Sequence, residues 1–217
     1  MRWVDALLRG GPAEATLGRC IACVVGGGAV YGAVMGTFGG FEGDRPLQIA
    51  YSAVKVPMLL GITFLLTLPS FFVLNTVLGL RADFGDVLRA VGAAQAGVAA
   101  VLTALAPYTA LWYLTSGNYQ EAILFNAAMF AVASLTAQAL VQRHYRPLVA
   151  RNPRHRWLMR AWVSVYAFVG VQMGWVLRPF VGSPEEPTRF FRQEAWGNAY
   201  VIVAEMIAAA IRGRFGL

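Results

Sequence analysis

Charged residues are scarce in this sequence. They make up 13% of its 217 residues, whereas about a quarter of a typical soluble domain is charged. Hydrophobic residues make up 58% of the chain and the mean hydropathy is +0.55. The charges cluster, so that stretches of about 20 residues are almost free of them. This composition excludes a soluble globular enzyme and a disordered chain. It predicts an all-α, polytopic transmembrane helical bundle, because a backbone in lipid must satisfy its own hydrogen bonds.

Cysteine and histidine are also rare, with two of each. Cys20 and Cys23 cannot form a disulfide framework, and they lack the further donors that a zinc site needs. His144 and His155 lie among arginines, whose charge disfavours a metal cation. No nucleophile–base pair, carboxylate pair or phosphate-binding glycine loop stands out. The sequence therefore predicts no catalytic residue, no metal site and no cofactor.

Five apolar stretches are long enough to cross a hydrocarbon core of about 30 Å as helices. They are residues 19–40, 55–78, 91–114, 122–141 and 157–180. We therefore expect a five-span bundle over residues 19–181, within a single membrane domain that takes in the whole chain.

The remaining segments are expected to lie at the edges of this bundle. Residues 1–18 form a short interfacial segment, and residues 182–195 form an external loop. A further apolar stretch predicts a C-terminal helix at 196–212, whose apolar part is about 24 Å long and therefore short for a crossing. We interpret it as an amphipathic or half-span helix, with a sixth crossing as the alternative.

Basic residues predict the orientation of the spans. The chain has 18 lysines and arginines, of which only Lys55 is a lysine, and a net charge of +7. The N-terminal segment and the second and fourth loops carry 11 of them, against 7 in the first loop, the third loop and the tail. The N-terminus is therefore expected on the cytoplasmic side of a bacterial inner membrane. The positively charged residues are expected to contact anionic lipid headgroups. No nucleic-acid partner is expected.

Glycines recur every four residues in the first span, at Gly28, Gly32, Gly36 and Gly40. Such a row forms a smooth ridge on one helix face, which lets another helix approach closely. The pattern predicts helix packing. The partner helix could belong to the same chain, to a second copy or to another membrane protein.

Polar side chains inside the spans are few. Four of them, Asn75, Gln95, Asn126 and Gln172, are candidates for a pathway for a small solute. Hydrogen bonding between helices is the alternative role for these amides.

Two groups of arginines are candidate contacts for a partner or for anionic lipid. The expected fourth loop, which lies before the fifth span, contains Arg151, Arg154 and Arg156. The second group, at the external end of the last span and in the tail, consists of Arg178, Arg189 and Arg192, and lies close to Trp175, Phe180 and Phe190. Aromatic and arginine side chains of this kind anchor helix ends at the membrane interface.

Several motifs resemble a group of uncharacterised bacterial polytopic integral membrane proteins. They are Lys55-Val56-Pro57, Leu68-Pro69-Ser70, Asn75-Thr76-Val77-Leu78-Gly79, the run from Gln172 to Phe180, and Phe190-Phe191-Arg192. The five-span layout is also similar to that of the Yip family, whose members work in membrane organisation and trafficking. This resemblance implies a non-catalytic membrane scaffold.

The sequence thus favours a non-catalytic inner-membrane subunit that associates through helix faces with itself or with a larger membrane assembly. A small channel or facilitator for a small solute is the alternative function.

Overall fold

The computed structural model describes residues 17–183 and 186–191. Within them the chain is helical and contains no strand, so the predicted all-α class is confirmed. The long helices are α2 (Leu17–Gly36), α3 (Arg45–Val77), α4 (Phe84–Thr115), α5 (Tyr119–Arg151) and α6 (Arg154–Val176). Two short 3₁₀ turns, η1 (Thr37–Gly39) and η2 (Arg81–Asp83), lie in the connections before α3 and α4.

Four helical segments of the described chain are long and apolar enough to cross a membrane. They are Leu17–Gly39, Arg45–Val77, Arg81–Thr115 and Tyr119–Arg151. At 1.5 Å per residue, the 33 residues of α3 extend for about 50 Å, which exceeds the roughly 30 Å of a hydrocarbon core. Helix α6 is 23 residues long but begins with basic residues, among them Arg154 and Arg156. Among the long helices, α6 contains no stretch as apolar as those of the other four.

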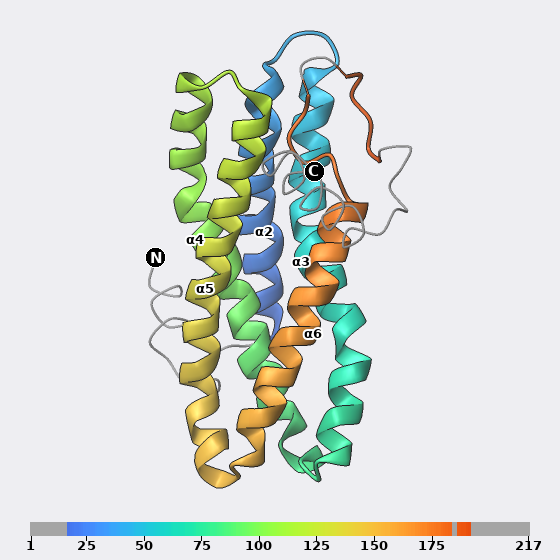
Figure 1. Ribbon diagram of the computed structural model, residues 1–217, viewed down its shortest axis with the longest axis vertical. Helices are drawn as coiled ribbons and strands as arrows, with labels where there is room; N and C mark the ends of the chain where they lie inside the picture. The colour runs from blue at the N-terminus through green and yellow to red at the C-terminus, as the bar shows by residue number, and fades with distance from the viewer. Residues whose placement is uncertain (1–16, 184–185, 192–217) are drawn as a thin grey trace, which may run out of the picture.

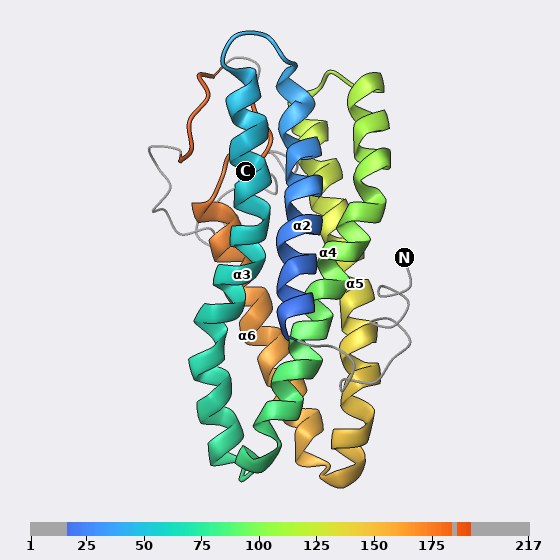
Figure 2. The same ribbon diagram turned by 180° about the vertical axis from the view of Figure 1, so that it is seen from behind.

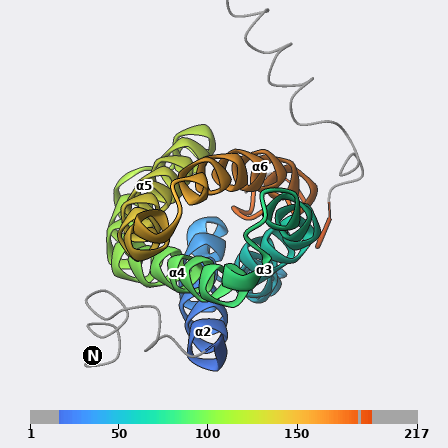
Figure 3. The same ribbon diagram turned by 90° about the horizontal axis from the view of Figure 1, so that it is seen from below.

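The helices run up and down in an elongated bundle (Figures 1 and 2). Helix α2 packs against both α3 and α4, while α5 packs on α4 and α6 packs on α3. Seen from below, α3, α4, α5 and α6 are arranged in a ring (Figure 3). Helices α5 and α6 meet at the turn that joins them and then diverge toward the opposite end (Figure 1). The contacts between α5 and α6 are therefore few compared with those that α2 makes with α3 and α4.

Glycines allow the close approach of α2 to α3. A Cβ atom on Gly36 would lie 2.6 Å from Ile49 Cα, and one on Gly28 would lie 3.1 Å from Pro57 Cγ. A Cβ atom on Gly32 would overlap the carbonyl oxygen of Ser52. This glycine face is therefore buried in a contact within the chain.

Gly40 does not belong to this face, contrary to the four-glycine ridge expected from the sequence. Helix α2 ends at Gly36, and Gly40 follows the 3₁₀ turn with a φ of +85°. Its role is conformational, because glycine adopts positive φ without the steric cost that a side chain would add.

The helices extend well past the apolar stretches, and this corrects the expected loops. Helix α3 begins at Arg45, not near Lys55. The expected Arg-rich fourth loop is almost entirely helical, since α5 continues to Arg151 and α6 begins at Arg154. Apolar runs mark only the part of a helix that fits the hydrocarbon core, whereas arginine and glutamine continue a helix readily. The break falls at Asn152, which has an extended backbone. Asn152 precedes a proline, and the proline ring disfavours helical geometry in the residue before it.

Other predictions fall outside the described residues. These are the C-terminal helix at 196–212, Arg192, and residues 1–16 of the expected interfacial segment.

Candidate functional site

A cavity of about 700 Å³ lies in the bundle between α3, α4, α5 and α6. Met35 of α2 contributes to the wall behind it. Pockets of 300–1,000 Å³ with mainly apolar walls are typical of sites for small molecules, and the space between the helices of a bundle is one of their usual places. This cavity is the candidate functional site.

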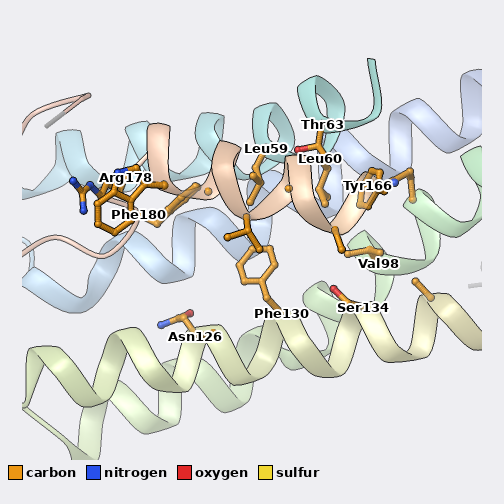
Figure 4. Close-up of a pocket in the computed structure, with 18 of the residues that line it drawn as sticks. Leu59, Leu60, Thr63, Val98, Asn126, Phe130, Ser134, Tyr166, Arg178 and Phe180 are labelled. Carbon is orange, nitrogen blue, oxygen red and sulfur yellow. The ribbon is translucent and has the colours of Figure 1, made fainter. Parts of the chain in front are cut away.

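The cavity is elongated along α6. Its lining includes a residue at every fourth position of that helix and just beyond it, namely Trp162, Tyr166, Gly170, Gly174 and Arg178. This stripe is about 24 Å long at the rise of an α-helix. Figure 4 shows Tyr166 and Val98 toward one end and Arg178 with Phe180 at the other. The cavity therefore has the length of an extended chain molecule.

One side of the cavity opens to the surroundings of the bundle. Lining residues that are also exposed lie on both helices that diverge there: Ile123, Ala127 and Ser134 on α5, and Ala167 and Val171 on α6. Most are small or apolar, and the helix to which the first three belong is a candidate membrane span. In a membrane, this opening would face lipid.

Two polar side chains in the lining, Gln95 and Asn126, are paired with tyrosines. Tyr166 donates a hydrogen bond to Gln95 Oε1 at 2.9 Å and so connects α6 to α4. Tyr31 donates to Asn126 Oδ1 at 2.9 Å, while Asn126 Nδ2 donates to Tyr113 at 2.5 Å. These bonds satisfy groups that would be costly to leave unpaired in an apolar interior.

The end of the cavity near Arg178 is closed by residues 177–183, which we call the strap. It leaves the end of α6 and crosses α3, where polar side chains donate hydrogen bonds to its carbonyl groups. Gln48 Nε2 lies 3.2 Å from the Phe180 oxygen, and Ser52 Oγ lies 2.5 Å from the same oxygen. Arg45 donates to the Ser183 oxygen at 2.6 Å. The strap is thus bound along one face of the first half of α3.

Lys55 completes this row of donors. Its side chain is fully buried, and Nζ donates a hydrogen bond to the Pro179 oxygen at 2.7 Å. The ammonium group also lies 4.8 Å from the centre of the Phe190 ring, in a cation–π contact. Among the residues that the structure describes, no carboxylate forms an ion pair with Lys55. A positive charge therefore lies directly behind the strap.

Arg178 and Trp175 form the polar part of this end of the cavity. The Arg178 guanidinium lies 3.3 Å from the centre of the Trp175 ring, and both residues line the cavity. Trp175 Nε1 is buried and has no hydrogen-bond partner within the described ranges. An indole N–H normally finds an acceptor when it is buried.

The four amides predicted for a solute pathway do not gather at one place. Gln95 and Asn126 line the cavity. Asn75 is fully buried elsewhere, in the last turn of α3, and Gln172 is half-buried on α6 outside the cavity lining. The cavity therefore contains two of the four, both bonded to tyrosines.

The arginines predicted to contact partners or lipid fall at opposite ends of the bundle. Arg151 lies 3.2 Å from Asp86, and Arg154 donates to the Leu78 carbonyl at 3.3 Å, so both hold the turn between α5 and α6 against the turn between α3 and α4. Arg156 is exposed at that end, and Arg189 is exposed beyond the strap. Of the arginines in these two groups that the structure describes, only Arg178 lines the cavity.

Sequence reasoning missed the donors that hold the strap. Arg45, Gln48, Ser52 and Lys55 are separated by three, four and three residues, which places them on one face of a helix. That spacing was a usable signal, but the first three residues lie before the expected start of the span. Sequence reasoning also missed His155, which is buried with Nε2 3.0 Å from Asp83 Oδ2.

Among the described residues, the titratable side chains that line the cavity are those of Arg178, Tyr119 and Tyr166. Its lining, as far as the structure describes it, contains no carboxylate, histidine or cysteine. The described residues also contain no group of three or more potential metal ligands. Comparison of the chain with protein-family models, with curated proteins and with solved structures found no match. The site itself must therefore carry the functional argument.

Proposed function

We propose that this chain is a non-catalytic integral membrane protein that accommodates a lipophilic molecule from the bilayer in the cavity between α5 and α6. The observation that carries the proposal is a cavity of about 700 Å³ with mainly apolar walls and an opening between two diverging helices. An apolar chain that enters it exchanges lipid contacts for contacts with the protein, and the opening lets it do so without passing through water.

We further propose that α6 is the fifth crossing, with the N-terminus on the cytoplasmic side of a bacterial inner membrane. The distribution of basic residues supports this orientation. It places the turn at Asn152–Pro153 on the cytoplasmic side and the strap toward the outer side. The apolar part of α6, after Arg160, then faces the bilayer.

Association with itself or with a larger assembly is a second proposal. It would need a surface other than the glycine face, because Gly28, Gly32 and Gly36 already contact α3. The outer face of α5, with Leu124 69% and Leu135 71% exposed, is a surface that a neighbouring transmembrane helix could cover. A channel for a small polar solute is less well supported, since the amides do not follow one path.

Tryptophan fluorescence can test the proposed function. Trp162 lines the cavity and is only 4% exposed, whereas Trp157, on the same helix, is 69% exposed. Two proteins would each retain one of these tryptophans, with the other five tryptophans changed to Phe. Each would be reconstituted in bilayers of phospholipids with brominated acyl chains, which quench tryptophan on contact. We expect strong quenching of Trp162, which follows Arg160, and weaker quenching of Trp157, which precedes it.

A cavity-filling variant provides the matched control. Gly170→Phe places a ring in the cavity, where a Cβ atom would be 3.6 Å from Thr63 Cγ2, and should reduce quenching of Trp162. Gly61→Phe adds the same ring to α3, where nothing lies within 4 Å of a Cβ atom and the residue does not line the cavity. It should leave the quenching unchanged. If Trp162 is not quenched in the parent protein, no acyl chain enters the cavity and the proposed function is wrong.

A further inference from the structure

We infer that the molecule in this cavity is an anionic phospholipid, with its headgroup at Arg178 and one acyl chain along α6. This inference rests on the proposed function and names the chemical class of its ligand. Four observations carry it: the single charge in the lining, the charge behind the strap, the depth of this end in the membrane, and the lateral opening.

The cavity is amphiphilic along its length. Of the described residues that line it, Arg178 is the one charged side chain, and it lies at one end. Trp175 is beside it with a buried indole N–H, which can donate to an ester or phosphate oxygen. Toward the other end the walls are mainly apolar and aromatic, with Val98, Phe130 and Tyr166 beside the small hydroxyl side chains of Thr63 and Ser134 (Figure 4). A molecule that fits this arrangement has an anionic oxygen group at one end and hydrocarbon behind it.

The strap adds to the positive potential at this end. Lys55 lies behind it with no carboxylate partner in the described part of the chain, and Arg45 also contacts it. Because side chains of α3 bind the carbonyl oxygens of Pro179, Phe180 and Ser183, these acceptors are directed away from the cavity. In an apolar environment, charge acts over a longer range than in water. An anion is therefore favoured over a zwitterion.

The depth of this end suits a phospholipid headgroup. If the roughly 50 Å of α3 is centred on a hydrocarbon core of about 30 Å, about 10 Å of helix projects at each side. Ser52 and Lys55 come seven and ten residues after Arg45, the start of the helix. They therefore lie about 10–15 Å from that end, near the boundary between headgroups and hydrocarbon. The strap that they bind lies at the same level.

The lateral opening favours a diacyl lipid over a free fatty acid. Ala127 on α5 and Val171 on α6 are exposed on either side of it. One acyl chain can occupy the cavity while the second remains in the surrounding bilayer through this opening. A lipid of the bilayer can thus bind without leaving the membrane.

Lipid retention tests the inference. The full chain would be reconstituted in vesicles containing equal amounts of phosphatidylglycerol and phosphatidylcholine with a small fraction of oleic acid. It would then be purified in mild detergent, and the bound lipid would be measured by mass spectrometry. We expect phosphatidylglycerol to be enriched by about tenfold, the scale of one hydrogen bond to a charged group. Arg178→Gln should abolish the enrichment, and Arg178→Lys should retain part of it.

Arg160→Gln is the matched control. Arg160 also lies over a tryptophan on α6, with its guanidinium 5.7 Å from the centre of the Trp157 ring, but at the other end of the helix and outside the cavity lining. Its loss should leave the enrichment unchanged. Equal effects of Arg160→Gln and Arg178→Gln would mean that surface arginines recruit the lipid, and would overturn the inference.

The remaining outcomes separate this inference from the proposed function. If both phospholipids are retained equally while Trp162 is still quenched by brominated chains, the headgroup assignment is wrong and the lipophilic cavity stands. Retention of oleic acid alone would also overturn the phospholipid assignment. If no lipid is retained and Trp162 is not quenched, both proposals fail.

Discussion

The Nζ atom of Lys55 donates a hydrogen bond to the carbonyl oxygen of Pro179, 2.7 Å away. This bond joins a fully buried lysine of α3 to the segment that follows α6, 124 residues later in the chain. A buried ammonium group is costly unless its hydrogens are bonded. The strap carbonyl therefore stabilises the buried Lys55, and Lys55 in turn holds the strap in place. The closure of one end of the cavity therefore depends on a row of donors on α3, together with Tyr119 of α5, which donates a hydrogen bond to the Val181 carbonyl.

Lys55→Met should loosen the strap. A cysteine introduced by Val181→Cys, in a chain whose own cysteines are changed to Ala, would report on it, because Val181 is only 4% exposed. Loss of a hydrogen bond to a charged group costs about 1.5–3 kcal/mol, so maleimide labelling should become at least about tenfold faster. The Tm of the bundle should change less, because methionine also removes the cost of a buried charge.

Thr76→Val is the control for this labelling experiment. It removes the hydrogen bond from Thr76 to the Phe72 carbonyl on the exposed side of α3. The labelling rate should stay at that of the parent. An equal rate in the Lys55→Met protein would show that this lysine does not hold the strap.

Gly32→Ala should destabilise the fold. The added methyl group would overlap the Ser52 carbonyl, so α2 and α3 would have to separate, at a typical cost of about 1–3 kcal/mol. Gly26→Ala, where nothing lies within 4 Å of a Cβ atom, should be neutral or stabilising by up to about 1 kcal/mol. Thermal unfolding in detergent measures both. A Gly32→Ala protein that keeps its Tm but changes its oligomeric state would place this face between chains instead.

Asp83→Ala should destabilise the end of the bundle where α5 turns into α6. It leaves Nε2 of the fully buried His155 without its partner, at a cost of about 1–3 kcal/mol. Asp86→Ala removes pairs to the exposed side chains of Arg89 and Arg151 and should cost less than about 1 kcal/mol. Chemical unfolding in micelles compares the two variants. Equal losses of unfolding free energy in the two variants would show that the burial of His155 does not strengthen its bond to Asp83.

Gln95 and Tyr166 should be coupled energetically. A double-mutant cycle with Gln95→Leu and Tyr166→Phe isolates the hydrogen bond between α4 and α6. Interhelical hydrogen bonds in membranes contribute about 0.6 kcal/mol on average in such cycles, and we expect a value of that size or somewhat above it. Unfolding free energies of the four proteins provide the measurement. A coupling energy of zero would mean that the hydrogen bond between Gln95 and Tyr166 does not stabilise the folded protein.

Much of the helical framework could be predicted from residues 17–183 alone. The all-α class and four of the apolar spans follow from long runs of apolar residues, and the structure contains helices at all of these positions. The helix ends could not be placed in the same way. The segments from Arg45 to Val54 and from Gln142 to Arg151 lie outside the most apolar runs, yet both are helical. Tertiary contacts bind polar side chains in each of them.

Most of the candidate site could not be predicted from the sequence. Arg178 was identified as an interfacial arginine, and Gln95 and Asn126 as polar residues within spans, but nothing local joins them. Their common position on one cavity depends on the divergence of α5 from α6. In contrast, the row of polar residues from Arg45 to Lys55 has helical spacing. It could have been predicted if the span had been extended toward the N-terminus beyond its apolar run.

The sequence by itself determined that this chain forms long helices suited to a membrane, because the backbone of an apolar run in lipid has only its own groups to bond with. Only the packing of the helices shows where the bundle is open, which face of the glycine-rich helix is covered, and which carbonyl accepts the hydrogen bond from Lys55. Those features depend on how the faces of distant helices meet, and the packing of one face against another is a property of the whole chain.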